Sequence, residues 1–255
     1  MKDIIIESTS KQFSISEDII GFSGEFSKSR QNESDIGDVT RIKYKNSIIV
    51  LYHNPSYYKA HKPQDSLGIF IHENVIKFGI ADGVSIVDGR EKNDSGKLSL
   101  ELIKTLPYLE INGWKNSIKT LLGDYLQSNF IGASTFTFGN INLERKVLEV
   151  LFVGSSEDIG INEIYQENEF RVVQNYSFGF LPKYFKESVT KNLLGNRFCL
   201  VFSSDGVSIE RRDVVSLVES DYLLLPIKGL LNELGKRVTK TFDDQSMIIV
   251  QKIID

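Results

Sequence analysis

Three aspartates of this sequence occupy the same kind of position, where an apolar run meets a polar turn: Asp82, Asp205 and Asp243. Each of the first two is followed by a glycine, and the third is followed by a second aspartate, Asp244. The ends of buried strands are held rigidly and still open to solvent, which is what a reactive site requires. These aspartates are therefore the first candidates for chemistry.

Carboxylates that a fold brings together repel one another unless a cation neutralises them. Oxygen-only ligands suit Mg²⁺ or Mn²⁺ rather than Zn²⁺. A glycine after the aspartate lets the backbone approach closely, so the Gly83 carbonyl is a further candidate ligand. Two such ions would activate a water and clamp an in-line displacement at phosphorus, which indicates hydrolysis of phosphate esters. Asp-Gly is also a common turn dipeptide, so each pair taken alone is more typical of a plain turn than of a metal site.

Other reactive constellations are weak in this sequence. The histidines His53, His61 and His72 show no metal-ligand spacing, and His72, beside an expected hairpin turn, is expected on the surface. Neither the serine-nucleophile elbow nor a glycine-rich phosphate loop is present. Cys199 lies inside an apolar run, where a free cysteine behaves as a small buried hydrophobe.

The composition is that of an ordinary globular protein, with 41% hydrophobic and 25% charged residues among 255. The net charge of −4, with lysine and arginine spread along the chain, argues against nucleic acid and against a membrane surface as partners. A single cysteine allows no internal disulfide. No apolar stretch reaches the length of a membrane span or a signal peptide, so a cytoplasmic location is expected.

The elements that must position the aspartates follow from hydrophobic periodicity. Apolar runs predict strands at 47–52, 67–71, 75–81, 134–138, 147–153, 170–173, 198–203 and 246–253. Helical spacing predicts helices at 98–106, 114–126, 214–218 and 227–238. Many strands follow one another directly, and the second and third form a hairpin around Glu73–Asn74. This order predicts an α+β fold in which mainly antiparallel sheets pack together with helices outside.

Residues 1–45 differ from the rest because they are rich in small polar and charged residues and show weak periodicity. We expect an N-terminal extension there, with one strand near Asp18–Phe22 and then a loop. The main domain is expected to span residues 46–255.

Taken in order, five segments resemble the metal-dependent serine/threonine protein phosphatases of the type 2C (PPM) family. They match that family's strand ending in Asp-Gly, its Gly-Ser/Ala-Thr strand, its Val-Gly-Asp-Ser strand, its Ser-Asp-Gly motif and its closing Asp-Asp/Asn motif. These segments are Phe78–Val84, Gly132–Thr135, Leu148–Ser156, Leu200–Val207 and Phe242–Val250.

The resemblance implies a four-layer α-β-β-α sandwich of two packed antiparallel sheets. It implies a phosphatase, of a bacterial-type branch, that hydrolyses phosphoserine and phosphothreonine in a phosphoprotein substrate by attack of a metal-bound water. Two ions, Mg²⁺ or Mn²⁺, are implied as cofactors. Asp82 would bridge them, Asp205 and Asp243 would complete one metal site, and the Gly83 carbonyl would help to hold the other. The resemblance does not define the oligomeric state.

The first motif of the family, in which an arginine precedes an aspartate, has two candidates here. The preferred one is His61–Asp65, directly before an expected strand, which makes Asp65 a further metal ligand. The other is Arg30–Asp35. In the preferred register Ala60 stands where the family has its phosphate-binding arginine, so Lys62 or Arg30 is the candidate for that role, with a solvated surface role equally open for each.

Three positions depart from the family pattern. Ser85 and Ile86 replace the glycines that follow the Asp-Gly pair, and Ser155 replaces the aspartate of Val-Gly-Asp-Ser. That aspartate belongs to an additional metal site in the family. These departures and the missing arginine leave an alternative open, namely a catalytically impaired pseudophosphatase that acts as a regulatory binding module.

Overall fold

The computed structural model describes residues 4–26, 36–56, 63–84, 86–87, 90–91, 94–123, 132–154, 162–166, 169–172, 186–207, 209–219, 221–238 and 243–252. Within these residues the strands form two large sheets and one short two-stranded ribbon. Every strand pair in them is antiparallel.

The seven-stranded sheet contains, in spatial order, β1 (Ile4–Ser8), β3 (Asp38–Tyr44), β4 (Ser47–Asn54), β15 (Gln245–Lys252), β14 (Phe198–Ser203), β11 (Asn162–Gln166) and β12 (Glu169–Val172). The six-stranded sheet contains β13 (Lys186–Leu193), β10 (Val147–Gly154), β9 (Phe136–Asn142), β6 (Val75–Ala81), β5 (Ser66–His72) and β2 (Ile19–Ser23). The ribbon consists of β7 (Ile86–Val87) and β8 (Arg90–Glu91).

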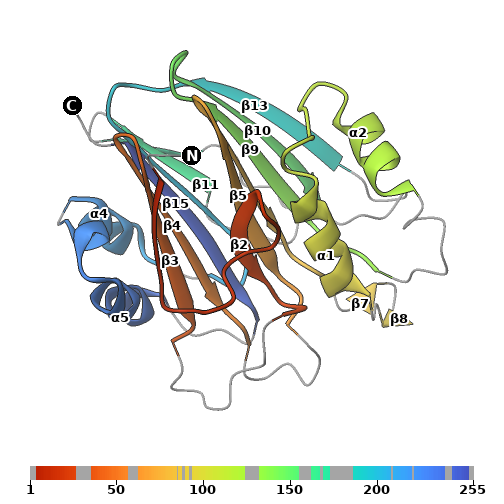
Figure 1. Ribbon diagram of the computed structural model, residues 1–255, viewed down its shortest axis with the longest axis horizontal. Helices are drawn as coiled ribbons and strands as arrows, with labels where there is room; N and C mark the ends of the chain where they lie inside the picture. The colour runs from red at the N-terminus through yellow and green to blue at the C-terminus, as the bar shows by residue number, and fades with distance from the viewer. Residues whose placement is uncertain are drawn as a thin grey trace.

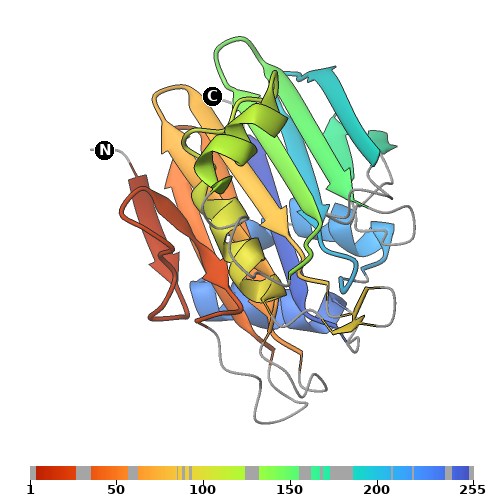
Figure 2. The same ribbon diagram turned by 90° about the vertical axis from the view of Figure 1, so that its right-hand side faces the viewer.

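The two sheets stack face to face, and helices cover both outer faces (Figure 1). The six-stranded sheet carries α1 (Ser95–Lys104) and α2 (Trp114–Leu121), as the turned view also shows (Figure 2). The seven-stranded sheet carries α4 (Arg211–Glu219), η1 (Tyr222–Leu224) and α5 (Ile227–Arg237). The predicted α+β sandwich of two antiparallel sheets flanked by helices is confirmed.

The central strands are apolar on both faces because each face lies against another layer. In β4, Ile49 and Leu51 point into the core between the sheets, while Ile48, Val50 and Tyr52 pack under α4 and α5. All five side chains are buried. A strand buried on both sides reads as a continuous apolar run, which is why these strands were recognisable in the sequence.

The N-terminal segment differs from its prediction. The sequence predicted one strand before residue 46, near Asp18–Phe22, and the structure has β2 there and also β1 and β3. Both additional strands belong to the seven-stranded sheet, where β1 pairs with β3 and β3 with β4. The number of strands is therefore corrected from one to three, while the division into an extension of residues 1–45 and a main domain of residues 46–255 stays a prediction.

Most of the remaining elements match predicted ones, whereas β7, β8, β11 and β13 have no counterpart among the predicted strands. The hairpin of β5 and β6 turns at Glu73–Asn74, and α5 begins directly after Pro226. Helix α2 ends at Leu121, earlier than expected, and residues 124–126 of the predicted helix lie outside the described part. Among the described residues, none of the helices combines the length and the apolar character that crossing a bilayer demands.

Candidate functional site

Two of the candidate aspartates meet at one end of the six-stranded sheet. Strands β5 and β6 are antiparallel neighbours, and their register pairs Ser66 with Ala81. The residue before β5 therefore lies beside the residue after β6, and these residues are Asp65 and Asp82. Both are buried, with 1% and 9% of their surface exposed.

The other two candidates meet at one end of the seven-stranded sheet. Strands β14 and β15 pair Ser203 with Met247, and the Ser204 N–H donates to the Ser246 carbonyl at 2.9 Å. Continuing this pairing places Asp205, after β14, opposite Gln245, and the next residue, Gly206, approaches Asp243, because a Cβ built on Gly206 would lie 3.2 Å from the Asp243 Cβ. Two pairs of antiparallel strands, one in each sheet, thus present four carboxylates at the same end of the sandwich.

The electrostatics of Asp82 show how closely the four carboxylates converge. Burial raises the pKa of the Asp82 carboxyl well above its ordinary value of 3.8, and the charges of Asp65, Asp205 and Asp243 raise it further. The two last residues belong to the other sheet. Asp82 therefore interacts electrostatically with carboxylates from both sheets.

Asp82 and Asp205 also share a hydrogen bond, which raises the pKa of Asp82 further. Two carboxyl groups can form such a bond only when one of them carries a proton. The Oδ1 atom of Asp205 is buried and accepts no hydrogen bond from any described residue. A buried acceptor without a donor is unfavourable, and a hard cation is a partner that would satisfy it.

Both glycines of the Asp-Gly pairs lie where another segment comes very close. A Cβ built on Gly83 would lie 2.7 Å from Cβ of Gln64, and one built on Gly206 would lie 1.8 Å from the Asp244 carbonyl oxygen. Any larger residue would push these segments apart. The glycines therefore allow the segments that carry the four aspartates to approach one another.

The carboxylate of Asp244, 1% exposed, joins two distant parts of the chain to the start of β15. Its Oδ1 accepts the Ser56 N–H and its Oδ2 accepts the Gln64 N–H, both at 2.7 Å. Gln64 directly precedes Asp65, so Asp244 fixes the backbone beside one of the candidate ligands. Sequence reasoning noted the Asp243–Asp244 pair but missed this role, for which the only signal was a second acid at a strand start.

Serine hydroxyls under α1 hold the segment around Asp82. The Asp82 carbonyl accepts from Ser134 Oγ at 2.9 Å, and Ser99 Oγ lies 3.0 Å from that same hydroxyl. Ser95 Oγ donates to the Val84 carbonyl at 2.6 Å. Ser95 and Ser99 are one turn apart on α1 and both fully buried, a spacing that could have indicated a polar contact on an otherwise apolar helix face.

Comparison with known proteins identifies the fold. No family model matches the sequence, and no curated protein matches it either. Solved structures do match: RsbX in complex with magnesium has a TM-score of 0.60 at 15% identity, with 84% of this chain and 98% of that chain covered. The serine/threonine phosphatase PstP of Mycobacterium tuberculosis has a TM-score of 0.55 at 9% identity, with 80% and 98% covered.

The serine/threonine phosphatase of S. agalactiae has a TM-score of 0.52 at 14% identity, with 82% and 100% of the two chains covered. The chain has the fold of the PPM-type serine/threonine phosphatases. The resemblance suggested by the sequence motifs is therefore confirmed at the level of the fold.

Within this PPM-type fold, the predicted site residues fall into two groups. The structure brings Asp65, Asp82, Asp205 and Asp243 together, and it places Gly83 beside them. In the described part of the chain, however, no three His, Cys, Asp or Glu side chains are arranged as a finished metal site. Lys62, Arg30, Ser85 and Ser155 lie outside the described residues.

The residues that are present fit a divalent cation in chemistry. All four side chains are carboxylates, the ligand type that Mg²⁺ and Mn²⁺ prefer, and Asp205 offers a buried oxygen that no described donor satisfies. The raised pKa of Asp82, caused by burial and by its acidic neighbours, means that positive charge would stabilise the ionised site. The roles of the individual residues stay predictions.

Proposed function

We propose that this protein is a metal-dependent phosphatase that removes phosphate from phosphoserine and phosphothreonine in a protein substrate. The observation that carries the proposal is the environment of Asp82, a buried carboxyl on which three further aspartates from other segments act. So much buried negative charge is unfavourable in a merely structural role, because nothing is gained by the repulsion. The PPM-type fold supports the same conclusion.

Asp82 would be a ligand of the divalent cations, Mg²⁺ or Mn²⁺, that the site would hold. Asp205 and Asp243 would hold one ion from the seven-stranded sheet, and Asp65 with the Gly83 carbonyl would contribute from the six-stranded sheet. When bound, such ions neutralise phosphate oxygens and lower the pKa of a coordinated water. Positive charge there would favour the ionised form of Asp82, whose pKa is raised by burial and by its acidic neighbours.

The chain's own residues would keep this arrangement rigid. Asp244 fixes the backbone at Gln64, and Ser134 fixes the Asp82 carbonyl. Rigid support matters because displacements on the order of 1 Å cost an active site much of its rate. Binding of the substrate phosphate by Lys62 or Arg30 stays a prediction, as do a bacterial origin and a cytoplasmic location.

The test is hydrolysis of p-nitrophenyl phosphate and of a phosphothreonine peptide in the presence of Mn²⁺. Activity should depend on Mn²⁺ and should fall at least about a hundredfold in Asp82→Asn, since one lost charge-stabilising group is worth several kcal/mol. Asp221→Asn is the matched control, because Asp221 is exposed and its positive φ of 53° suits asparagine. Full activity of Asp82→Asn would overturn the mechanism.

The second candidate function is a regulatory binding module with the same fold. The observation that favours it is the lack of a finished metal-ligand group among the described residues. Ser155, in place of an acidic residue, points the same way. Calorimetric titration with Mn²⁺ separates the two candidates: heat of binding that disappears in Asp82→Asn supports the enzyme, whereas no binding at millimolar Mn²⁺ supports the regulatory module.

A further inference from the structure

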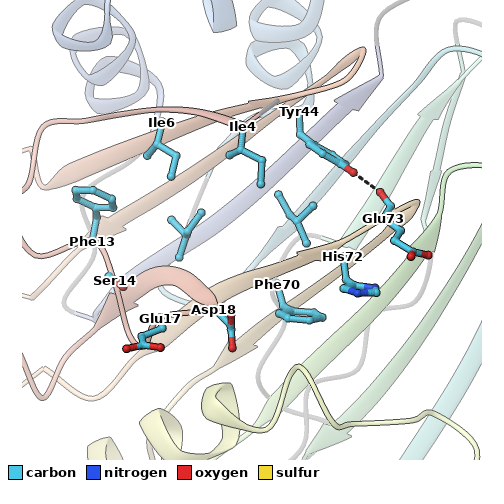
Figure 3. Close-up of a pocket in the computed structure, with 12 residues that line it drawn as sticks. Ile4, Ile6, Phe13, Ser14, Glu17, Asp18, Tyr44, Phe70, His72 and Glu73 are labelled. Carbon is cyan, nitrogen blue, oxygen red and sulfur yellow. Dashed lines mark hydrogen bonds between the residues drawn. The ribbon is translucent and has the colours of Figure 1, made fainter. Parts of the chain in front are cut away.

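A cavity of about 640 Å³ lies between the edges of the two sheets (Figure 3), and its lining residues do not include Asp65, Asp82, Asp205 or Asp243. Its wall on the six-stranded sheet includes Phe70 and His72, at the end of β5 opposite to Asp65. Asp65 and Glu73 flank the seven residues of β5, and the eight residue steps between them correspond to about 27 Å along the strand. The cavity is therefore separate from the candidate metal site.

The interior of the cavity is apolar. Ile4 and Ile6 of β1 face Phe13 and Phe70 across it (Figure 3). At its inner side it is continuous with the core between the sheets, because Ile20 and Ile71 line the cavity and also pack against that core. A volume of this size lies within the range of natural ligand pockets, which span about 300–1,000 Å³.

The rim of the cavity is acidic. Glu17, Asp18 and Glu73 line it and are exposed, and no lysine or arginine is among its lining residues in the described chain. None of the three carboxylates forms an ion pair with a described residue. The neighbouring Lys45 donates instead to the Asn74 side chain and to the Glu73 carbonyl.

The cavity lies along a strand edge that is open. β1 is the last strand of its sheet, and its register pairs only with β3 among the described strands. Alternate backbone N–H and C=O groups of an edge strand point away from the sheet and can pair with another chain. A strand added there would direct alternate side chains to the same side as Ile4 and Ile6, which is over the cavity.

We propose that this groove is a docking site for an extended segment of a partner protein that has apolar residues at alternate positions and basic residues at its two ends. The segment pairs with the outer edge of β1. Its apolar side chains enter the cavity, and lysine or arginine side chains at its two ends meet Glu17 and Asp18 at one end of the cavity and Glu73 at the other (Figure 3). The three features select different properties of the partner: the edge selects extended backbone, the cavity apolar side chains and the rim positive charge. This site does not depend on the proposed phosphatase activity.

The experiment uses the full chain and a fluorescein-labelled peptide, Lys-Lys-Val-Ser-Leu-Ser-Val-Lys-Lys, followed by fluorescence anisotropy at physiological ionic strength. The peptide should bind, and a matched peptide with glutamate in place of every lysine should bind at least about tenfold more weakly. The double variant Glu17→Lys/Glu73→Lys should weaken binding of the basic peptide to a similar degree. Glu144→Lys, an exposed glutamate outside the cavity, is the control and should stay within about twofold.

Two further measurements test the strand pairing and the apolar cavity. N-methylation of alternate peptide residues should abolish binding in one of the two possible registers and spare it in the other, because only one set of amides faces β1. Ile6→Glu should weaken binding, and its unchanged unfolding temperature would show that the fold is intact, since Ile6 is already 39% exposed. Equal binding of the basic and acidic peptides, or no effect of methylation in either register, would overturn the proposal.

Discussion

Burial and three neighbouring carboxylates act on Asp82 in the same direction, and all of them favour the protonated acid. In the unfolded chain Asp82 loses its proton near 3.8, whereas in the folded chain it keeps the proton to higher pH. The folded state thus binds more protons between these two pKa values. Its stability relative to the unfolded state must therefore decrease as the pH rises through this window.

We expect this dependence in the free energy of urea unfolding of the metal-free protein. The contribution of Asp82 is fully present below its unfolded pKa and is lost as the pH rises through its raised folded pKa. Measurements in chelator from about pH 4 to about pH 8 should show that Asp82→Asn becomes progressively more stable relative to the natural chain. A constant difference in unfolding free energy between the two proteins over this pH range would contradict a raised pKa of Asp82 in the folded state.

Gly206 tests the close approach of the two segments that carry Asp205 and Asp243. A Cβ at this position would lie 1.8 Å from the Asp244 carbonyl oxygen, so Gly206→Ala must displace the backbone before β15. We expect a loss of about 1–3 kcal/mol in the free energy of unfolding, the usual range for forced displacement. Gly123→Ala is the control, because a Cβ there would meet nothing within 4 Å. Equal stability of Gly206→Ala and Gly123→Ala would contradict the close approach of Gly206 to the Asp244 carbonyl.

At the scale of the elements, sequence patterns predicted the strands that have neighbours on both faces. β4 and β14 are buried throughout, β15 is buried except at its last residue, and the centre of each reads as a continuous apolar run. The strands that were missed in the large sheets are β1, β3, β11 and β13. β1 and β13 are edge strands, β11 is the second strand from an edge, and β3 includes the charged residues Arg41 and Lys43. Arg41 is nevertheless buried, because Glu7 and the carbonyls of Leu223 and Leu225 accept its hydrogen bonds.

The candidate site was predictable to the extent that it depends on strand ends. Asp82, Asp205 and Asp243 each adjoin an apolar run, so their positions followed from the pattern. The supporting contacts of Asp244 and Ser134 depend on segments far apart in the chain, which no local pattern reveals. Asp244, for example, reaches an amide 188 residues away.

The Asp244 side chain links the start of β15 to the segment that precedes β5. Removing its carboxylate should therefore loosen that segment. Asp244→Asn replaces one acceptor oxygen by an NH₂ group that faces a backbone donor. We expect a loss of about 1–3 kcal/mol in unfolding free energy, because a buried N–H is left unsatisfied. Hydrogen exchange should quicken at the Ser56 and Gln64 amides more than in the centre of β4.

Mn²⁺ affinity shows whether Asp244 also positions a candidate metal ligand. If Asp244 acts by fixing Gln64 beside Asp65, Asp244→Asn should weaken Mn²⁺ binding in calorimetry even at temperatures where the variant is fully folded. Unchanged Mn²⁺ affinity together with faster amide exchange would show that Asp244 stabilises the connection without positioning a ligand.

At the scale of the whole molecule, the four candidate aspartates are divided equally between the two large sheets. Asp65 and Asp82 adjoin β5 and β6, and Asp205 and Asp243 adjoin β14 and β15. In the metal-free protein, repulsion at this end acts against the packing of the core between the sheets. A bound cation would replace the repulsion by a link from one sheet to the other, so its effect should extend to the whole sandwich.

Cys199 can report this effect far from the aspartates. It is buried between β14 and the covering helices, and burial raises the pKa of its thiol to about 12. Alkylation therefore requires opening of the structure, and its rate follows the population of the open state when reclosing is fast. Mn²⁺ at about 100 times its dissociation constant should stabilise the folded state by about 2.7 kcal/mol and slow alkylation about a hundredfold.

The control for this prediction is Asp82→Asn, in which Mn²⁺ should leave the alkylation rate unchanged. A rise in unfolding temperature should accompany the slower labelling in the natural chain, because both follow from the same binding energy. Calorimetric Mn²⁺ binding without slower alkylation would mean that the ion attaches to one sheet only, or that Cys199 becomes accessible through a local opening. In that case the link between the sheets is absent, although the acidic cluster still binds metal.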